Sequence, residues 1–248
     1  LKLEREIEHS ERLELVRAKA HILPEEDLEL QVDEYQKLLE SKDFEIMRNA
    51  LSGTIELHDR FYEREQVRSQ VEALVAEGSR TMPSTMRFDF MCRLTEQALQ
   101  HGDRAHAAKR LEAVQRVFDE ARWIPEDHVP GLARLGSLRF RTGSTSQGLG
   151  QLGAALGVFE AERYRVPDVF RGDALRPVAQ AYMEVGEPEN ALSVYRKLVE
   201  EGALNPNSRP RAQDLVRTAL ALVHLNLRPD DALRSRIEEL GRGLGEPW

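Results

Sequence analysis

Four arginines recur at a nearly constant interval, because Arg93, Arg134, Arg176 and Arg217 are separated by 41, 42 and 41 residues. A guanidinium group can donate two parallel, charge-assisted hydrogen bonds to one carboxylate or phosphate. If a repeated element of this length carries each arginine, the four side chains form a ladder that binds an acidic, extended segment of a partner. The alternative is that they are ordinary surface residues, solvated or paired with Asp and Glu of neighbouring elements, in a chain with 29 Arg and 6 Lys.

Other patterns that often carry chemistry lack their required context. The segment Gly148–Gly153 matches G-x-G-x-x-G, a pattern that binds a dinucleotide only between a strand and a helix, whereas here it falls inside a predicted helix. The histidines are scattered, and His101 and His106 lie five residues apart, so they do not share one helix face. Neither H-E-x-x-H nor G-x-S-x-G occurs.

The single cysteine, Cys92, excludes an intrachain disulfide and a cysteine-based metal site, and it has no obvious His partner. We therefore predict no catalytic residue, no metal and no cofactor, and we do not expect an enzyme. A groove with clustered, strongly shifted carboxylates or histidines would reverse that expectation.

A repeat of about 41 residues organises the elements that carry the arginines. The clearest copy, Val178–Leu198, predicts two amphipathic helices joined by a tight turn at Gly186. Related segments are Thr54–Leu74, Leu94–Val114, Leu135–Ala155 and Ala219–Glu239. Each has one position at which we expect the two helices to touch, and these positions are 40 to 43 residues apart: Val67, Ala107, Gly148, Ala191 and Ala232.

The segments between the copies repeat as well. Pro83, Pro125, Pro167 and Pro210 are 42, 42 and 43 residues apart, and each precedes or opens the next predicted first helix. Proline fits a loop or the first turn of a helix and ends the helix before it. The prolines thus support the phase of the repeat independently of the apolar pattern.

The order of small residue, aromatic, Gly turn, small residue and aromatic in Ala179–Leu198 resembles the tetratricopeptide repeat (TPR) family, and the resemblance covers about residues 48–240. The period exceeds the usual ~34 residues of that family, which implies longer helices or loops. Another α-solenoid, such as HEAT, shares the period but lacks the Gly turn followed by Ala. The resemblance implies an all-α, right-handed α-solenoid of about five TPR-like helical hairpins with an N-terminal helical pair.

In TPR-like solenoids the first helix of each hairpin lines a concave groove that binds peptides, some of them through basic side chains on the peptide's carboxylates. The resemblance therefore implies a groove whose side chains come from the inward positions of the first helices, beside Asp59. The predicted groove residues are Arg60, Arg93, Glu96, Arg134, Phe140, Arg141, Arg176, Gln180, Arg217 and His224.

We predict three parts of the chain. Residues 1–47 form an N-terminal helical pair or cap, residues 48–240 the repeat solenoid, and residues 241–248, with three Gly and a Pro, a flexible tail. Leu13, Val16, Ala20 and Leu23 form one apolar stripe of the cap. The Gly-rich stretch 143–157 is expected to be the least stable part of the solenoid.

Composition favours a helical fold for this chain of 248 residues, since Leu and Ala are abundant and aromatic residues make up 6%. Protein binding is what the resemblance implies. The net charge of −8 falls entirely in residues 1–75, so there is no basic excess for nucleic acid. We expect a non-catalytic scaffold that binds a protein or peptide, or alternatively a sensing module of a larger signalling or transcription protein. No membrane insertion is expected. Compartment and oligomeric state stay open, because cytoplasmic and exported proteins both fit this composition.

Overall fold

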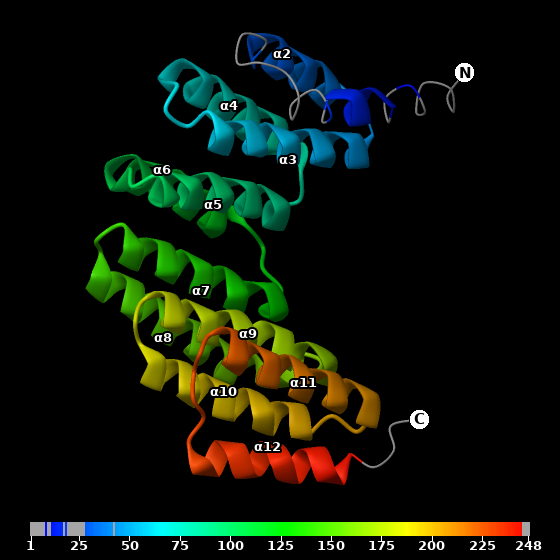
Figure 1. Ribbon diagram of the computed structural model, residues 1–248, viewed down its shortest axis with the longest axis vertical. Helices are drawn as coiled ribbons and strands as arrows, with labels where there is room; N and C mark the ends of the chain where they lie inside the picture. The colour runs from blue at the N-terminus through cyan, green and yellow to red at the C-terminus, as the bar shows by residue number, and fades with distance from the viewer. Residues whose placement is uncertain (1–7, 9–10, 17, 19–27, 42, 245–248) are drawn as a thin grey trace. The chain divides into compact units, whose positions relative to one another are not determined.

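A computed structural model describes residues 8, 11–16, 18, 28–41 and 43–244. Helices make up 84% of the described residues, among which there is no strand. The chain divides into two compact units, residues 1–121 and 122–248. The predicted all-α fold of consecutive helical hairpins is confirmed, and each unit contains a stack of them (Figure 1). No helix in the described part is long and apolar enough to span a bilayer.

In the first unit, helical residues 11–16 and one further helix precede two hairpins. Helix α2 (Leu28–Leu39) precedes the hairpin of α3 (Phe44–Arg60) and α4 (Glu65–Gly78), which a short 3₁₀ turn, η2 (Ser79–Thr81), follows. The second hairpin consists of α5 (Ser84–Gln100) and α6 (Arg104–Glu120). The buried Leu13 and Val16 join the same core, whereas Ala20 and Leu23 of the predicted stripe lie outside the described residues.

The second unit contains three hairpins. They are α7 (Pro125–Arg141) with α8 (Thr145–Glu162), α9 (Asp168–Glu184) with α10 (Pro188–Ala203), and α11 (Ser208–His224) with α12 (Asp231–Gly243). The 3₁₀ turn η3 (Arg163–Arg165) separates α8 from α9. The predicted boundaries after residues 47 and 240 stay predictions, and α12 itself continues to Gly243.

The predicted turns occur where the sequence places them. Gly102, Gly143 and Gly186 have φ of +77°, +111° and +77°, a left-handed conformation that glycine adopts without steric cost. The turn of the last hairpin uses Asn226 at φ +49°, because asparagine tolerates this region better than other side chains do. Helices begin as expected too, since prolines occupy the N-cap or first turn of every first helix from α5 onwards.

Four of the five predicted contact positions are buried, and the fifth prediction is wrong. Ala107 and Ala191 have no exposed surface, and a Cβ on Gly148 would lie 2.7 Å from the carbonyl oxygen of Gly136. Ala232, in contrast, is exposed, and Leu233 is the residue that α12 buries. Helix α12 has no described helix beyond it, so less of its surface is covered than in the preceding second helices.

Candidate functional site

Two of the three regularly spaced arginines of the second unit, Arg176 and Arg217, form ion pairs between consecutive first helices. Arg176 Nη2 on α9 lies 3.4 Å from Asp214 Oδ1 on α11, and Arg217 Nη1 on α11 lies 3.0 Å from Asp173 Oδ1 on α9. Asp214 is buried, and this burial raises its pKa although the charge of Arg176 acts in the opposite direction. Both arginines thus help join neighbouring hairpins. This matches the alternative stated for them, in which they pair with Asp and Glu of neighbouring elements.

The four arginines do not share one helical position when they are counted from the turn. Arg93, Arg134 and Arg217 lie nine residues before their turn residues, whereas Arg176 lies ten before Gly186, where the ninth position is Pro177. One residue corresponds to about 100° around an α-helix. Arg93 also belongs to the first unit and the other three to the second. A continuous ladder therefore stays a prediction.

The remaining predicted groove residues differ in exposure. Phe140 packs against Gly148 and the core of its own hairpin, because an added Cβ at Gly148 would lie 2.8 Å from the Phe140 Cβ. The Arg60 guanidinium lies over the ring of Phe61, 5.1 Å from its centroid. Glu96 and Arg141 are half-buried, and Gln180 and His224 are exposed.

One predicted arginine lines a cleft between two first helices. A cleft of about 460 Å³ lies between α3 and α5 in the first unit. Helix α3 contributes Arg48, Asn49 and Ser52, and helix α5 contributes Thr85, Met86, Asp89, Phe90 and Arg93. Its lining combines two guanidinium groups, the carboxylate of Asp89, amide and hydroxyl groups and two apolar side chains. Such a combination can bind the backbone and side chains of an extended segment.

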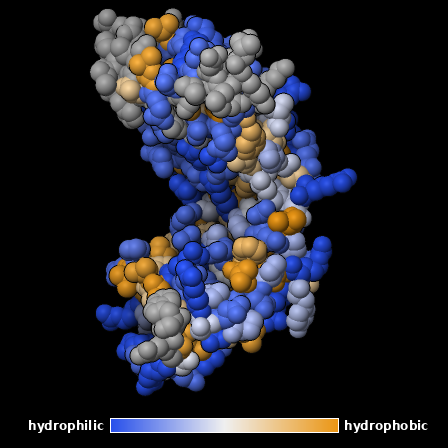
Figure 2. Space-filling view, turned by 90° about the vertical axis from the view of Figure 1, so that its right-hand side faces the viewer, coloured by the Kyte–Doolittle hydropathy of each residue, from blue (hydrophilic) through white to orange (hydrophobic). Residues whose placement is uncertain are grey.

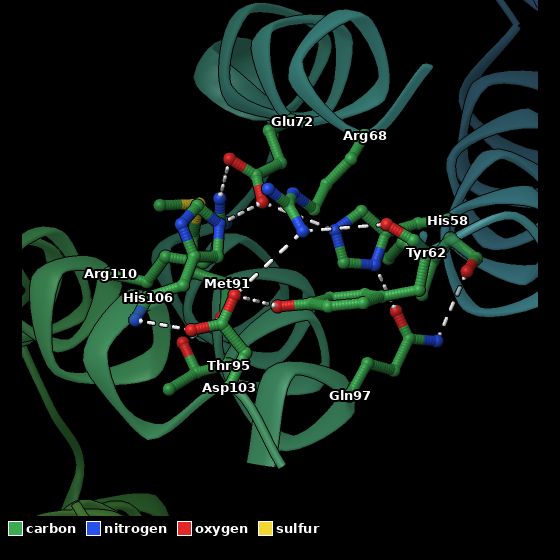
Figure 3. A network of polar contacts seen from close by, with 11 residues as sticks. His58, Tyr62, Arg68, Glu72, Met91, Thr95, Gln97, Asp103, His106 and Arg110 are labelled. Carbon is green, nitrogen blue, oxygen red and sulfur yellow. Dashed lines mark hydrogen bonds and ion pairs between the residues drawn. The ribbon is translucent and has the colours of Figure 1, made fainter. Parts of the chain in front are cut away.

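A second cluster of polar side chains, which sequence reasoning missed, lies between the two hairpins of the first unit (Figure 3). The carboxylate of Glu72 on α4 accepts from three groups: His106 Nε2 at 2.6 Å, Arg110 Nη1 at 2.8 Å and His58 Nε2 at 3.1 Å. His58 has no exposed surface, and its Nδ1 lies 2.7 Å from Gln97 Oε1. Gln97 donates in turn to the backbone carbonyl of Ile55.

Tyr62 continues this cluster toward the turn of the second hairpin (Figure 3). Its hydroxyl donates to Asp103 Oδ2 at 3.2 Å, and Arg68 lies over its ring, 4.8 Å from the centroid. The ring of His101 stacks on the Tyr62 ring with 4.4 Å between the two centroids. Burial, followed by the charge of Asp103, raises the pKa of Tyr62 to about 12.

Internal partners hold Glu72 in its charged form. Burial by itself raises the pKa of this carboxyl, but the hydrogen bond from His58, the charge of Arg110 and the hydrogen bond from His106 together lower the pKa to about 2. Burial also lowers the pKa of Arg110, whose Nε and Nη2 have no hydrogen-bond partner. Glu72 is thus an acceptor that joins α3, α4 and α6, and both of its oxygens already accept from groups of the protein.

No local spacing in the sequence indicates this cluster. His106 and Arg110 are four residues apart on α6, but His58 and Glu72 come from the preceding hairpin, so only the packing of consecutive hairpins brings the four together. In the part of the chain described, no group of three or more His, Cys, Asp or Glu side chains has an arrangement that could hold a metal ion.

Exposed apolar side chains form a further feature of the second unit. Figure 2 shows a largely hydrophilic surface that small apolar patches interrupt. On α11, Val216, Leu220 and Val223 are 58%, 51% and 74% exposed. They recur at intervals of four and three residues, so they share one face of the helix.

Comparisons with known proteins give neither a matching family model nor a matching curated protein. Among solved structures, the chain is similar to a chain of Podosopora anserina that is assigned as a kinesin light chain with nearly identical TPR-like repeats. The identity is 16%, the TM-score 0.44, and the match covers 79% of this chain and 97% of that one. For a form of that protein with a single substitution, the identity is 18%, the TM-score 0.44, and the match covers 78% of this chain and 92% of that one.

Proposed function

We propose that this array of TPR-like hairpins is a non-catalytic protein-binding module that takes up an extended, acidic segment of a partner in the cleft between α3 and α5. The cleft itself carries the proposal, because the first helices of two consecutive hairpins line it and one of the predicted groove residues, Arg93, lies in its wall.

The lining of the cleft matches the chemistry of such a segment. Arg48 and Arg93 can each bind a carboxylate, although Arg48 also pairs with Glu45 one turn earlier at 2.6 Å. Asn49 and Ser52 can bond the amide groups that an extended backbone leaves unpaired. Met86 and Phe90 offer an apolar floor for alternate side chains. A segment with acidic residues spaced along an otherwise small or apolar sequence fits this arrangement.

A non-catalytic role is consistent with the polar cluster of the first unit. The carboxylate whose pKa is shifted most strongly, Glu72, faces His58, His106 and Arg110 within the protein. A general acid or base needs a free path to its substrate, whereas these contacts occupy Glu72 in joining the hairpins.

The experiment is a selection of linear random peptides on the immobilised full chain, followed by fluorescence anisotropy of the enriched peptides. We expect enrichment of Asp and Glu, and about five- to tenfold weaker binding for Arg93→Ala and for Arg48→Ala, since a partly exposed charge pair contributes about 1 kcal/mol. Binding should weaken as salt is raised.

The matched control is Arg80→Ala, which removes an exposed arginine of the same unit that pairs with Glu77 at 3.0 Å outside the cleft. It should leave the affinity unchanged. Enrichment of basic or purely apolar peptides, or an equal loss of affinity in the Arg80 and Arg93 variants, would show that the cleft does not bind an acidic segment.

A further inference from the structure

Val216, Leu220 and Val223 form an exposed apolar stripe on α11. In α7, the first helix of an earlier hairpin, the positions equivalent to Val216 and Leu220 are buried. Counted back from the turn residue, Val216 and Leu220 lie ten and six residues before Asn226. Ala133 and Ser137 on α7 lie ten and six residues before Gly143, and they are 0% and 2% exposed. The same face of a first helix is therefore covered in α7 and open in α11.

Helix α9 provides the cover on α7. Ser137 Oγ donates to Glu184 Oε2 on α9 at 2.5 Å, and the ribbons of α7 and α9 run side by side within the second unit (Figure 1). The equivalent face of α9 carries the polar Arg176 and Gln180, and Arg176 contacts α11 through Asp214. On α11 the face is apolar and has no described helix upon it. An added helix can therefore pack on this face of α11 in the way that α9 packs on α7.

A cleft of about 510 Å³ lies beside this stripe, between α11 and α12. The cleft has apolar walls from Val223, Leu222, Leu227 and Ile237. Its charged lining residues are Arg228, Arg234 and Glu238, two of them basic and one acidic. Because it adjoins the C-terminal end of the stripe, a helix lying on α11 can insert one large apolar side chain into it.

The charges around the stripe define the partner. Asp214 is the single acidic residue of α11 and is buried, whereas Arg209 and Arg228 are exposed and Arg217 is 56% exposed at its side chain despite its pair with Asp173. A partner helix with Asp or Glu beside its apolar stripe meets these guanidinium groups favourably. A second copy of this chain would bring α11 against α11, and so arginine near arginine.

We propose that α11 is a docking site for an amphipathic, acidic α-helix of another protein, which covers Val216, Leu220 and Val223 as α9 covers α7. This site lies in the second unit and binds a helix, so it is independent of the cleft between α3 and α5 and of the function proposed for it.

The test is a selection on the full chain from a displayed library of 20-residue amphipathic helices (a length of about 30 Å) whose polar positions vary among Glu, Lys, Gln and Ser. We expect Glu to be enriched beside the apolar stripe. Leu220→Ser should weaken the selected helix at least tenfold, and Leu204→Ser, which alters a leucine of similar exposure (57%) outside the stripe, should leave it unchanged. Circular dichroism of both variants checks that each remains folded.

Several results would overturn the proposal. These are enrichment of Lys, no enrichment at all, or equal binding to the Leu220 and Leu204 variants. Sedimentation of the full chain tests a last alternative. A dimer that Leu220→Ser dissociates would overturn the proposal, because the stripe would then bind a second copy of this chain. Arg93→Ala should not affect the selected helix, so failure here and failure of the cleft between α3 and α5 are distinguishable.

Discussion

Replacing Glu72 by Gln should destabilise the first unit by about 3 kcal/mol at pH 7. The substitution keeps the shape of the side chain but removes the charge that faces Arg110 Nη1 at 2.8 Å. Arg110 is only 9% exposed, and two of its nitrogens have no hydrogen-bond partner, so its charge would stay buried without compensation. Removing one member of a buried pair costs about 3–5 kcal/mol.

The pKa of Glu72 leads to the same magnitude. A decrease from 4.5 in the unfolded chain to about 2 in the folded protein corresponds to about 3 kcal/mol at about 1.4 kcal/mol for each pH unit. Because the folded pKa is the lower one, this stabilisation is fully present above pH 4.5. It is lost as the pH falls from 4.5 toward 2, where the folded protein takes up the proton as well.

Urea unfolding followed by circular dichroism at pH 7, 4.5 and 3 measures the effect. The difference between wild type and Glu72→Gln should be largest at pH 7 and shrink by more than half at pH 3. Glu77→Gln is the control, because its side chain is 74% exposed and its pair with Arg80 contributes less than about 1 kcal/mol. A loss at pH 7 no larger than that of the control, or one that stays constant down to pH 3, would refute the role assigned to Glu72.

Two pairs of substitutions test the packing of the hairpins, each by thermal unfolding. Gly148→Ala should destabilise the protein by about 1–3 kcal/mol, since the new Cβ would lie 2.7 Å from the backbone of Gly136 and of Phe140. Gly150→Ala, with no atom within 4 Å of its Cβ, should instead stabilise it by about 0.5–1 kcal/mol. A change of the same sign for both variants would contradict the helix contact at Gly148. Ala191→Leu, at a position with no exposed surface, should lower the free energy of unfolding by about 1–3 kcal/mol. Ala203→Leu, beside a cavity of about 280 Å³, should lower it by less. Equal melting temperatures of the two variants would show that the phase of the repeat is wrong.

The repeat could be predicted because its signals are local. A glycine at the turn, a small residue five positions later and a proline before the next hairpin each report on the backbone within a few residues, and Gly102, Gly143 and Gly186 indeed adopt positive φ. Helix α10 continues to Ala203, beyond the end of the predicted copy at Leu198, because the boundary depends on the last turn of the helix. The predicted helix contact at Ala232 was wrong for a different reason, since burial on α12 depends on which helices surround α12.

The candidate site could be predicted only in part. The sequence places Arg93 on a first helix, and a cleft lies there, but the interval that links Arg93 to Arg176 does not keep the two at one helical position. The contacts of Glu72 with His58 and His106 join residues 14 and 34 positions apart, so no motif on one element contains them. Contacts between consecutive hairpins depend on how the hairpins pack, so residue spacing alone does not predict which side chains contact one another.

Hydrogen–deuterium exchange of the full chain, with and without a peptide selected on it, tests the central claim most directly, namely that the first helices of the first unit bind the partner. The account predicts that the peptide slows exchange in α3 and α5, which line the cleft, and that Arg93→Ala clearly reduces this protection when the peptide is kept near its dissociation constant. Protection confined to α4 and α6, or protection that is undiminished in the Arg93 variant, would contradict it.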